Sequence, residues 1–199
     1  MNENLQDLNK ILTGFSDLDY YLKGLEKGDL ITIASRPKNG RTTLAFNIGA
    51  FVAGAGTPVA IFNLKSKALK DNKELKNMYI FNDFDLDRIK EKSIKLLLNY
   101  NLGLVIIDDV ELIESNNNEV WLGLYKMAKE LDIPILVTTK VNIPKRKDDK
   151  LYLADLNYDI LHYARQILFL YNEENRLIVN VARNTNGNTG VIKLESMEE

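Results

Sequence analysis

Residues 27–53 read KGDLITIASRPKNGRTTLAFNIGAFVA and contain the pattern that decides the fold. Residues 27–34 form a short apolar run with the length and composition of a buried parallel strand. A polar turn, SRPKNGR, separates this run from residues 42–53, whose mostly apolar pattern is helical. The β-branched run PVAIFNL follows at residues 58–64, so the stretch predicts a strand, a helix and a second strand.

The rest of the chain continues this alternation of strands and helices. Buried strands are predicted at residues 103–109 (GLVIIDD) and 134–139 (PILVTT), with helical patterns between them. Further on, QILFLY (166–171) and RLIVNVA (176–182) flank the turn NEEN, which is typical of an antiparallel hairpin. The sequence therefore predicts an α/β fold, with a mainly parallel sheet flanked by helices and a C-terminal antiparallel hairpin.

Length and composition favour a single domain over residues 1–199, because 45% hydrophobic residues are enough for one core. No run approaches the about eighteen apolar residues that span a membrane, and the polar start MNENLQDLNK lacks a signal-peptide pattern. We therefore expect a soluble, cytoplasmic protein without a membrane partner. The chain has no cysteine, which excludes disulfides, thiolate metal sites and cysteine nucleophiles. Its net charge of -2 argues against a globally basic nucleic-acid-binding surface, although a local basic patch is permitted.

The polar turn resembles a phosphate loop, GxxxxGK[ST], in which backbone N–H groups and a lysine hold phosphates at a helix N-terminus. Ser35 stands where the first glycine would be and Arg41 replaces the lysine, whereas Gly40 and Thr42 match. The helix start still favours an anion, but the planar Arg41 side chain is bulkier than an ammonium group. Whether the loop holds ATP or ADP with Mg²⁺, another anion or nothing stays open. The candidate nucleotide-binding residues are Ser35, Arg36, Pro37, Lys38, Asn39, Gly40, Arg41, Thr42 and Thr43.

Four stretches of the chain resemble the C-terminal RecA-like motor domain of DnaB-type replicative helicases. They are residues 14–49, 58–67 (PVAIFNLKSK), 102–113 (LGLVIIDDVELI) and 132–142 (DIPILVTTKVN), in the family's order. The resemblance implies a RecA-like P-loop NTPase fold in which Thr42 and Asp108 would hold Mg²⁺. It also implies that the family's N-terminal primase-interacting domain has no counterpart here, and that this chain is shortened after its second strand.

The positions that drive hydrolysis in that family differ in this chain. The resemblance places Lys65 where the family has the glutamate that orients the attacking water, and Lys140 where it has a polar sensor, usually glutamine. Arg183 and Thr185 match the lysine and arginine that reach the neighbouring subunit's nucleotide, so the arginine finger is absent. Losing one general base or one electrostatic stabiliser slows a reaction by roughly 10²–10⁴. We therefore expect no intact catalytic set.

The two carboxylates at the end of the predicted strand have two interpretations. Asp108 and Asp109 either contribute to a magnesium site or form a strand end that Lys65 and Lys140 neutralise. The second interpretation needs no ligand, because a salt bridge then closes the site.

A basic run, Lys145, Arg146 and Lys147, matches the place where the family presents loops to single-stranded DNA. Phosphate contacts there would be independent of sequence and sensitive to salt, but a solvated surface loop explains the run equally simply. His162, the only histidine, has no metal-type neighbours in its predicted helix, so we expect a packing or surface role. Trp121 lies at a core-facing helical position and is predicted to pack in the core or an interface.

Three functional hypotheses follow from the sequence. The leading one is a degenerate DnaB-like protein that acts by binding, as an accessory or regulator of DNA replication or as a partner within a helicase ring. The first alternative is a working ATP-dependent DNA helicase subunit with altered catalytic residues. The second is a single-stranded DNA-binding module that needs no nucleotide. The corresponding partners are single-stranded DNA, a replicative helicase, or other copies of this chain.

Overall fold

The computed structural model of the protein describes residues 10–63, 73–114, 119–143, 150–173 and 176–194. The helices are α1 (Ser16–Leu22), α2 (Arg41–Gly54), α3 (Leu86–Tyr100), α4 (Val120–Leu131) and α5 (Tyr158–Tyr163), with short 3₁₀ helices η2 (Val110–Leu112) and η3 (Leu153–Asp155). The strands are β1 (Leu30–Ser35), β2 (Val59–Asn63), β3 (Lys73–Leu75), β4 (Met78–Phe81), β5 (Leu104–Asp108), β6 (Ile135–Lys140), β7 (Gln166–Glu173), β8 (Arg176–Asn184) and β9 (Gly190–Leu194). No helix in the described part of the chain is long and apolar enough to cross a membrane.

One nine-stranded sheet runs through the molecule in the order β3-β4-β2-β5-β6-β1-β7-β8-β9. The strands from β4 to β7 are parallel, whereas β3 pairs with β4, and β8 with both β7 and β9, in antiparallel fashion. The predicted mainly parallel sheet and its C-terminal antiparallel hairpin are therefore confirmed.

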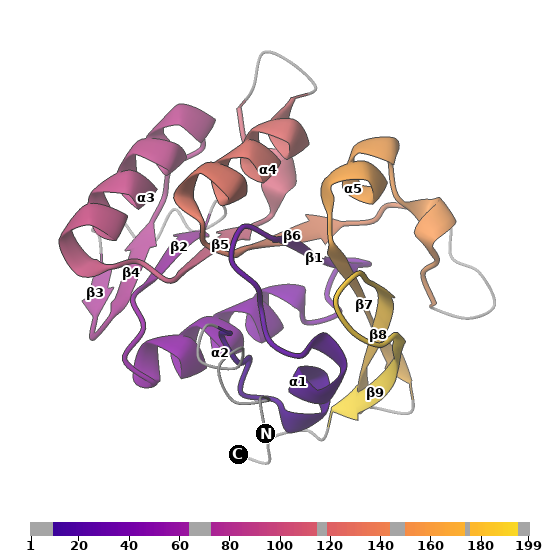
Figure 1. Cartoon of the computed structure of the whole chain (residues 1–199). Coiled ribbons are helices and arrows are strands. Elements are labelled where there is room, and N and C mark those ends of the chain that lie inside the picture. Colours follow the sequence, from indigo (N-terminus) through magenta and orange to yellow (C-terminus); the bar gives the residue numbers. More distant parts are fainter. Residues whose placement is uncertain (1–9, 64–72, 115–118, 144–149, 174–175, 195–199) are drawn as a thin grey trace.

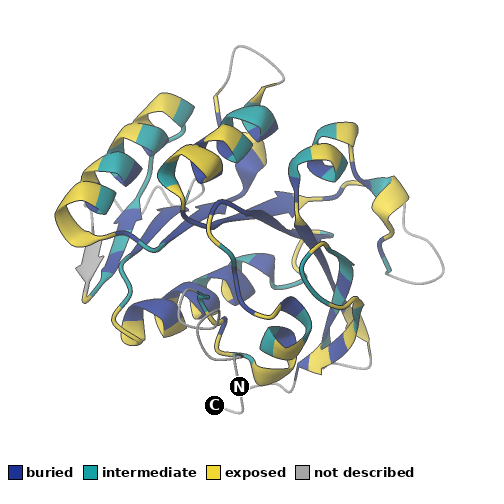
Figure 2. Cartoon of the chain, in the orientation of Figure 1, coloured by how far each residue is buried: buried dark blue, intermediate teal, exposed yellow. Residues whose placement is uncertain are grey.

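Helices cover both faces of the sheet, with α3, α4 and α5 on one side and α1 and α2 on the other (Figure 1). Each face has its own hydrophobic core, because side chains along a strand point alternately to opposite faces. In β5, for example, Val105 and Ile107 join one core while Leu104 and Ile106 join the other. The central strands are accordingly buried along their length (Figure 2).

Helix α2 packs very close to the sheet, and this packing fixes the turn that precedes it. A Cβ atom on Gly49 would lie 2.9 Å from Cδ1 of Ile106 and 3.2 Å from Cδ1 of Ile61, so glycine permits the close approach. The helix begins at Arg41, directly after Gly40, which has φ 81°. Glycine adopts a positive φ of this kind without steric cost, so Gly40 lets the chain turn from β1 into α2.

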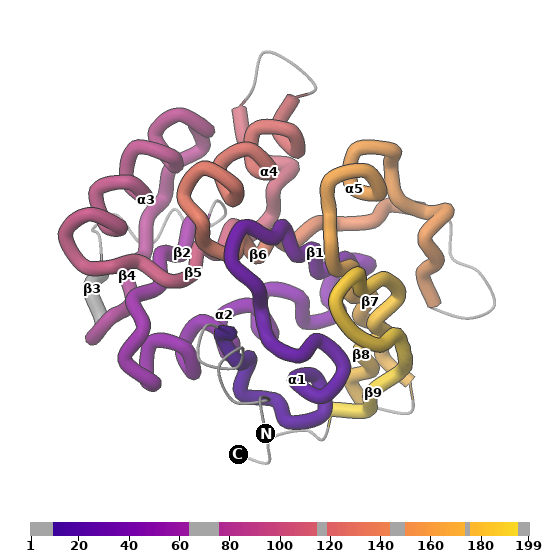
Figure 3. The backbone as a smooth tube through the Cα atoms, in the orientation of Figure 1, coloured from indigo at the N-terminus to yellow at the C-terminus, as the bar shows by residue number. Residues whose placement is uncertain are grey.

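Two elements were not anticipated from the sequence. Helix α1 has no side-chain cap and ends at Lys23 in a left-handed conformation, and it lies against β9 at the far end of the sheet (Figure 3). Strand β3 adds a short antiparallel edge next to β4. Both elements depend on partners distant in the sequence or on a tight turn, neither of which produces a strong periodic pattern.

Candidate nucleotide-binding site

The polar turn between β1 and α2 lies where β1, β5 and β6 end, at the carboxyl edge of the parallel strands. Ligands of open α/β sheets bind at this edge. The turn forms a pocket of about 470 Å³. Its described lining residues are Pro37, Lys38, Gly40, Arg41, Thr42, Thr43 and Lys140, so the structure groups most of the predicted nucleotide-binding residues in one place.

The backbone of the turn leaves the start of α2 uncapped. Gly40 is the N-cap residue and makes no side-chain cap hydrogen bond to the first turn of the helix. Lys38 has φ 66°, which puts a second residue of the turn in the left-handed region. Ser35 is buried and its hydroxyl donates to the carbonyl of Arg36 at 2.8 Å, while Asn39 accepts from Asn172 of β7 at 3.3 Å. Free N–H groups and the helix dipole therefore still favour an anion at this pocket.

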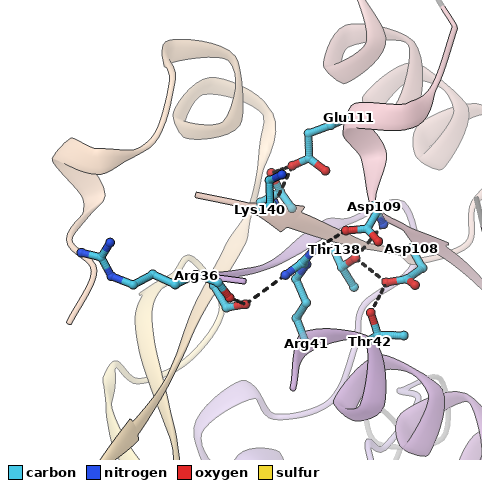
Figure 4. A network of polar contacts seen from close by, with 10 residues as sticks. Arg36, Arg41, Thr42, Asp108, Asp109, Glu111, Thr138 and Lys140 are labelled. Carbon is cyan, nitrogen blue, oxygen red and sulfur yellow. Dashed lines mark hydrogen bonds and ion pairs between the residues drawn. The ribbon is translucent and has the colours of Figure 1, made fainter. Parts of the chain in front are cut away.

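Arg41 does not face solvent; its side chain is buried and forms an ion pair with Asp109 (Figure 4). Nη2 of Arg41 contacts Oδ1 of Asp109, and Nη1 lies 3.5 Å from the Ser35 hydroxyl. The Nε atom of Arg41 is buried without a hydrogen-bond partner. The two residues that break the phosphate-loop pattern, Ser35 and Arg41, thus lie next to each other, and Asp109 supplies the compensating charge.

The expectation that Lys140 helps to neutralise the two carboxylates needs correction. Asp109 pairs with Arg41, and Lys140 forms no ion pair with a described residue. Lys140 ends β6 beside Ser35, and its backbone N–H donates to Oε1 of Glu111 at 2.5 Å. Lys140 is also one of the lining residues of the phosphate pocket. Lys65 lies outside the described residues.

Asp108 and Thr42 form the part of the site that matches a magnesium-binding pair. The hydroxyl of Thr42 donates to Oδ1 of Asp108 at 2.9 Å, and Thr138 donates to the same oxygen at 2.6 Å. Thr138 also accepts the backbone N–H of Asp109 at 2.8 Å, which holds both carboxylates in place. Burial raises the pKa of Asp108 above its ordinary value; the hydrogen bond from Thr138 opposes this shift and the neighbouring Asp109 adds to it.

The donor set fits Mg²⁺ bound together with a nucleotide. Mg²⁺ is usually held by one or two carboxylates together with phosphate oxygens and waters, and Asp108 and Thr42 offer such oxygens at the phosphate pocket. No group of three or more His, Asp or Glu that could hold a metal by itself occurs among the described residues. Asp108 and Thr42 therefore suit Mg²⁺ only in company with phosphate oxygens, and the described part of the chain shows no separate metal centre.

Other predicted site residues lie away from the phosphate pocket. Arg183 donates through Nη1 to the carbonyl of Leu161, and Thr185 contacts Asn186 at 3.2 Å, so both are engaged within the chain. Lys145, Arg146 and Lys147 fall outside the described residues. His162 is exposed and stacks on Tyr158 with ring centroids 5.4 Å apart, which confirms a surface role, and Trp121 is buried in the core as predicted.

Two residues of the network were missed in the sequence. They are Thr138 and Glu111, which lie near the ends of β6 and β5. Thr138 is buried and donates to Asp108, and Glu111 accepts from the Thr139 hydroxyl and from the backbone N–H of Lys140. Both lie in stretches that resemble the helicase family, but the resemblance assigned no role to either residue. The only available signal was that β5 and β6 are neighbouring parallel strands, so that polar residues at their carboxyl ends meet.

Comparison with known protein families gives a match over nearly the whole chain. The family described as DnaB-like helicase C terminal domain matches residues 10–76 and 65–199. The two matched blocks overlap at residues 65–76, shortly after β2, where the sequence predicts a shortened segment.

The curated relatives are replicative helicases. The chain is 25% identical over 253 residues to the replicative DNA helicase DnaB of Geobacillus stearothermophilus, covering 97% of this chain and 56% of that protein. It is 28% identical over 254 residues to the replicative DNA helicase DnaB of Buchnera aphidicola subsp. Baizongia pistaciae (strain Bp), covering 97% of this chain and 55% of that protein. The chain therefore spans about half the length of the curated relatives it matches.

Two solved structures share the fold. The ATPase domain of a protein called G40P superposes with a TM-score of 0.83 at 21% identity, covering 92% of this chain and 87% of that one. A DnaB-like replicative helicase, solved to describe its interactions with primase, gives a TM-score of 0.84 at 21% identity, covering 95% and 60%. The α/β architecture predicted from the sequence is thereby confirmed as that of a DnaB-like ATPase domain.

Proposed function

Since this chain belongs to the DnaB-like helicase C-terminal domain family, we propose that it acts in DNA replication by binding, as an accessory or regulatory protein, and not by hydrolysing ATP. The observation that carries this proposal is the buried ion pair between Arg41 and Asp109. Arg41 stands where the phosphate-binding lysine would be, and its side chain is already paired with Asp109 without any ligand.

The ion pair opposes productive nucleotide binding energetically. To reach a phosphate, Arg41 would have to leave Asp109, and removing one partner of a buried ion pair typically costs about 3–5 kcal/mol. Such a cost corresponds to a loss in affinity of roughly 10²–10⁴ unless the phosphate compensates it.

The residues at the pocket also provide no group to activate water. The described lining of the phosphate pocket contains no carboxylate, and Lys140 at the sensor position carries an ammonium group. An ammonium group cannot act as the general base, and the same holds for Lys65 at the position of the family's glutamate. These features support a site that does not hydrolyse ATP.

Binding of ATP or ADP with Mg²⁺ remains part of the proposal as a weak, non-hydrolytic interaction. Gly40, Thr42 and Thr43 would present the helix N-terminus to phosphate, and Thr42 with Asp108 would hold Mg²⁺. A bound Mg²⁺ would neutralise phosphate charge and orient the β- and γ-phosphates. The described lining residues would position the nucleotide, but none of them is a base that could activate the attacking water.

The proposed partners are a replicative helicase or other copies of this chain, in the cytoplasm, together with single-stranded DNA if Lys145, Arg146 and Lys147 contact its phosphates. One observation favours the alternative of a working ATP-dependent helicase subunit: the hydroxyl of Thr42 donates to Asp108, and the family resemblance assigns these two residues to Mg²⁺. Hydrolysis is therefore the property that separates the two functions.

Steady-state ATP hydrolysis by the purified chain tests the proposal. We expect phosphate release with saturating Mg²⁺-ATP to equal that of the Asp108→Ala variant, with or without a single-stranded oligonucleotide. Turnover near the roughly 1 s⁻¹ of an ordinary slow enzyme, stimulated by the oligonucleotide and lost in Asp108→Ala, would establish the helicase alternative instead.

A further inference from the structure

A second pocket shares Lys140 with the phosphate pocket but opens on the α4 and α5 side of the sheet. Its volume is about 430 Å³, and it is formed by the ends of β5 and β6 together with the starts of α4 and α5. Its buried lining includes Trp121, Leu156 and Ile160, and Glu111 and Lys140 are among its exposed residues. We call it the β6–α5 pocket.

The β6–α5 pocket combines an apolar interior with a negative charge. Among its described lining residues, the carboxylates of Glu111, Asp155 and Asp159 oppose the single ammonium of Lys140. Asp159 is half-buried in the first turn of α5 and makes no side-chain hydrogen bond or ion pair with a described residue. The pocket is therefore complementary to a ligand that carries positive charge next to apolar surface.

The walls of the pocket are held in place before any ligand binds. On the β6 side, Val141 donates its N–H to the Ser35 carbonyl at 2.9 Å, and Nη1 of Arg36 donates to the Ile143 carbonyl at 2.7 Å. On the α5 side, Asn157 caps the helix by accepting the N–H of Ile160 at 3.0 Å. A preformed site loses less conformational entropy on binding than a flexible one.

We propose that the β6–α5 pocket binds a segment of a partner protein in which a lysine or arginine lies next to a large apolar side chain. The cation would face Asp159 and Glu111, and the apolar side chain would pack on Leu156 and Ile160. The indole of Trp121 adds an aromatic surface, which attracts lysine and arginine cations as well as apolar groups. Nucleic acid is a poor match, because its phosphates would meet three carboxylates and one ammonium.

This proposal goes beyond the function proposed above and does not depend on it. A chain that hydrolyses ATP could use the same pocket, and a chain that only binds could lack a ligand there. The two ideas therefore fail in different experiments.

Two matched hexapeptides, blocked at both ends, serve as probes: Lys-Leu-Arg-Phe-Leu-Lys and Glu-Leu-Glu-Phe-Leu-Glu. Trp121 is the only tryptophan of the chain and lines the pocket, so its fluorescence reports occupancy directly. We expect the cationic peptide to change the emission of Trp121 in a saturable manner, more weakly at high salt, and the acidic peptide to leave it unchanged.

Variants of the pocket locate the interaction. Asp159→Asn should weaken the cationic peptide about three- to tenfold, as expected for removal of one partly exposed charge, and Asn142→Lys, which adds a cation to the exposed lining, should weaken it similarly. Glu130→Gln on α4 makes the same change of charge as Asp159→Asn at an exposed site outside the pocket, and should have no effect. Thermal melting checks that all three variants are folded.

Three outcomes would overturn the proposal. The cationic peptide could fail to alter the Trp121 emission, the acidic peptide could bind equally well, or the pocket variants could bind like the parent chain. Oligodeoxythymidylate that changes the Trp121 emission and displaces the cationic peptide would instead identify the pocket as a nucleic-acid site.

Discussion

Asp109→Asn removes the charge that faces Arg41 but keeps a side chain that tolerates the backbone at this position, where φ is 62° and ψ is 66°. The side chains of Arg41 and Asp109 expose only 6% and 3% of their surface, so the guanidinium left behind is poorly solvated. Losing one partner of a buried ion pair costs about 3–5 kcal/mol. Because asparagine still offers an oxygen acceptor, we expect a loss of about 3 kcal/mol in the free energy of unfolding.

A double-mutant cycle measures this interaction without attributing the whole loss to it. Urea unfolding at pH 7 of Arg41→Met, Asp109→Asn and the double variant should give a coupling energy of about 2 kcal/mol, because the double variant removes both charges of this pair together. The exposed pair Glu91 and Lys95 on α3, changed to Gln and Met, is the control, with a coupling below about 0.5 kcal/mol. A coupling between Arg41 and Asp109 no larger than the control's would refute the assignment of a buried ion pair.

Three further predictions concern Asp108, Thr138 and Gly49. The pKa of Asp108 is raised by burial, so its neutral form stabilises the fold and this contribution disappears as the pH rises through that raised pKa. Asp108→Asn should therefore gain stability relative to the parent chain as the pH rises above about 4, the ordinary pKa of an aspartate, and a difference in urea midpoint that is independent of pH would contradict this. Thr138→Val removes two buried hydrogen bonds and should lower the free energy of unfolding by about 1–3 kcal/mol. An unchanged free energy of unfolding would show that solvent satisfies the hydrogen-bonding groups left behind. Gly49→Ala should destabilise by about 1–3 kcal/mol in thermal melts because its Cβ meets Ile106, whereas Gly54→Ala, with open space around it, should be neutral or stabilising; equal melting temperatures would show that α2 can move away.

The strands and the phosphate-loop region could be predicted from the sequence because their signals are local. Residues 27–53 alternate from an apolar run to a polar turn to a helical pattern, and the structure places β1, the turn and α2 there. The pairing of Thr42 with Asp108 could also be predicted, since the resemblance to DnaB-type helicases assigns both residues to one site.

The ion pair at the centre of the site could not be predicted in the same way. Arg41 and Asp109 are 68 residues apart, and they meet only because β1 and β5 end at the same edge of the sheet on either side of β6. The sequence suggested Lys65 and Lys140 as the neutralising cations. Lys140 forms no ion pair with a described residue, and Lys65 lies outside the described residues. Which cation turns inward depends on side-chain packing, and periodicity carries no information about that choice.

The central claim is that Asp109 holds Arg41 away from the position of a bound phosphate. Isothermal titration calorimetry of Mg²⁺-ATP into the parent chain and into Asp109→Asn tests it most directly, at a temperature where both are folded. The account predicts that Asp109→Asn binds the nucleotide at least about tenfold more tightly, because the guanidinium is released and one opposing negative charge is gone. Equal affinity, or tighter binding by the parent chain, would show that the ion pair does not control the pocket.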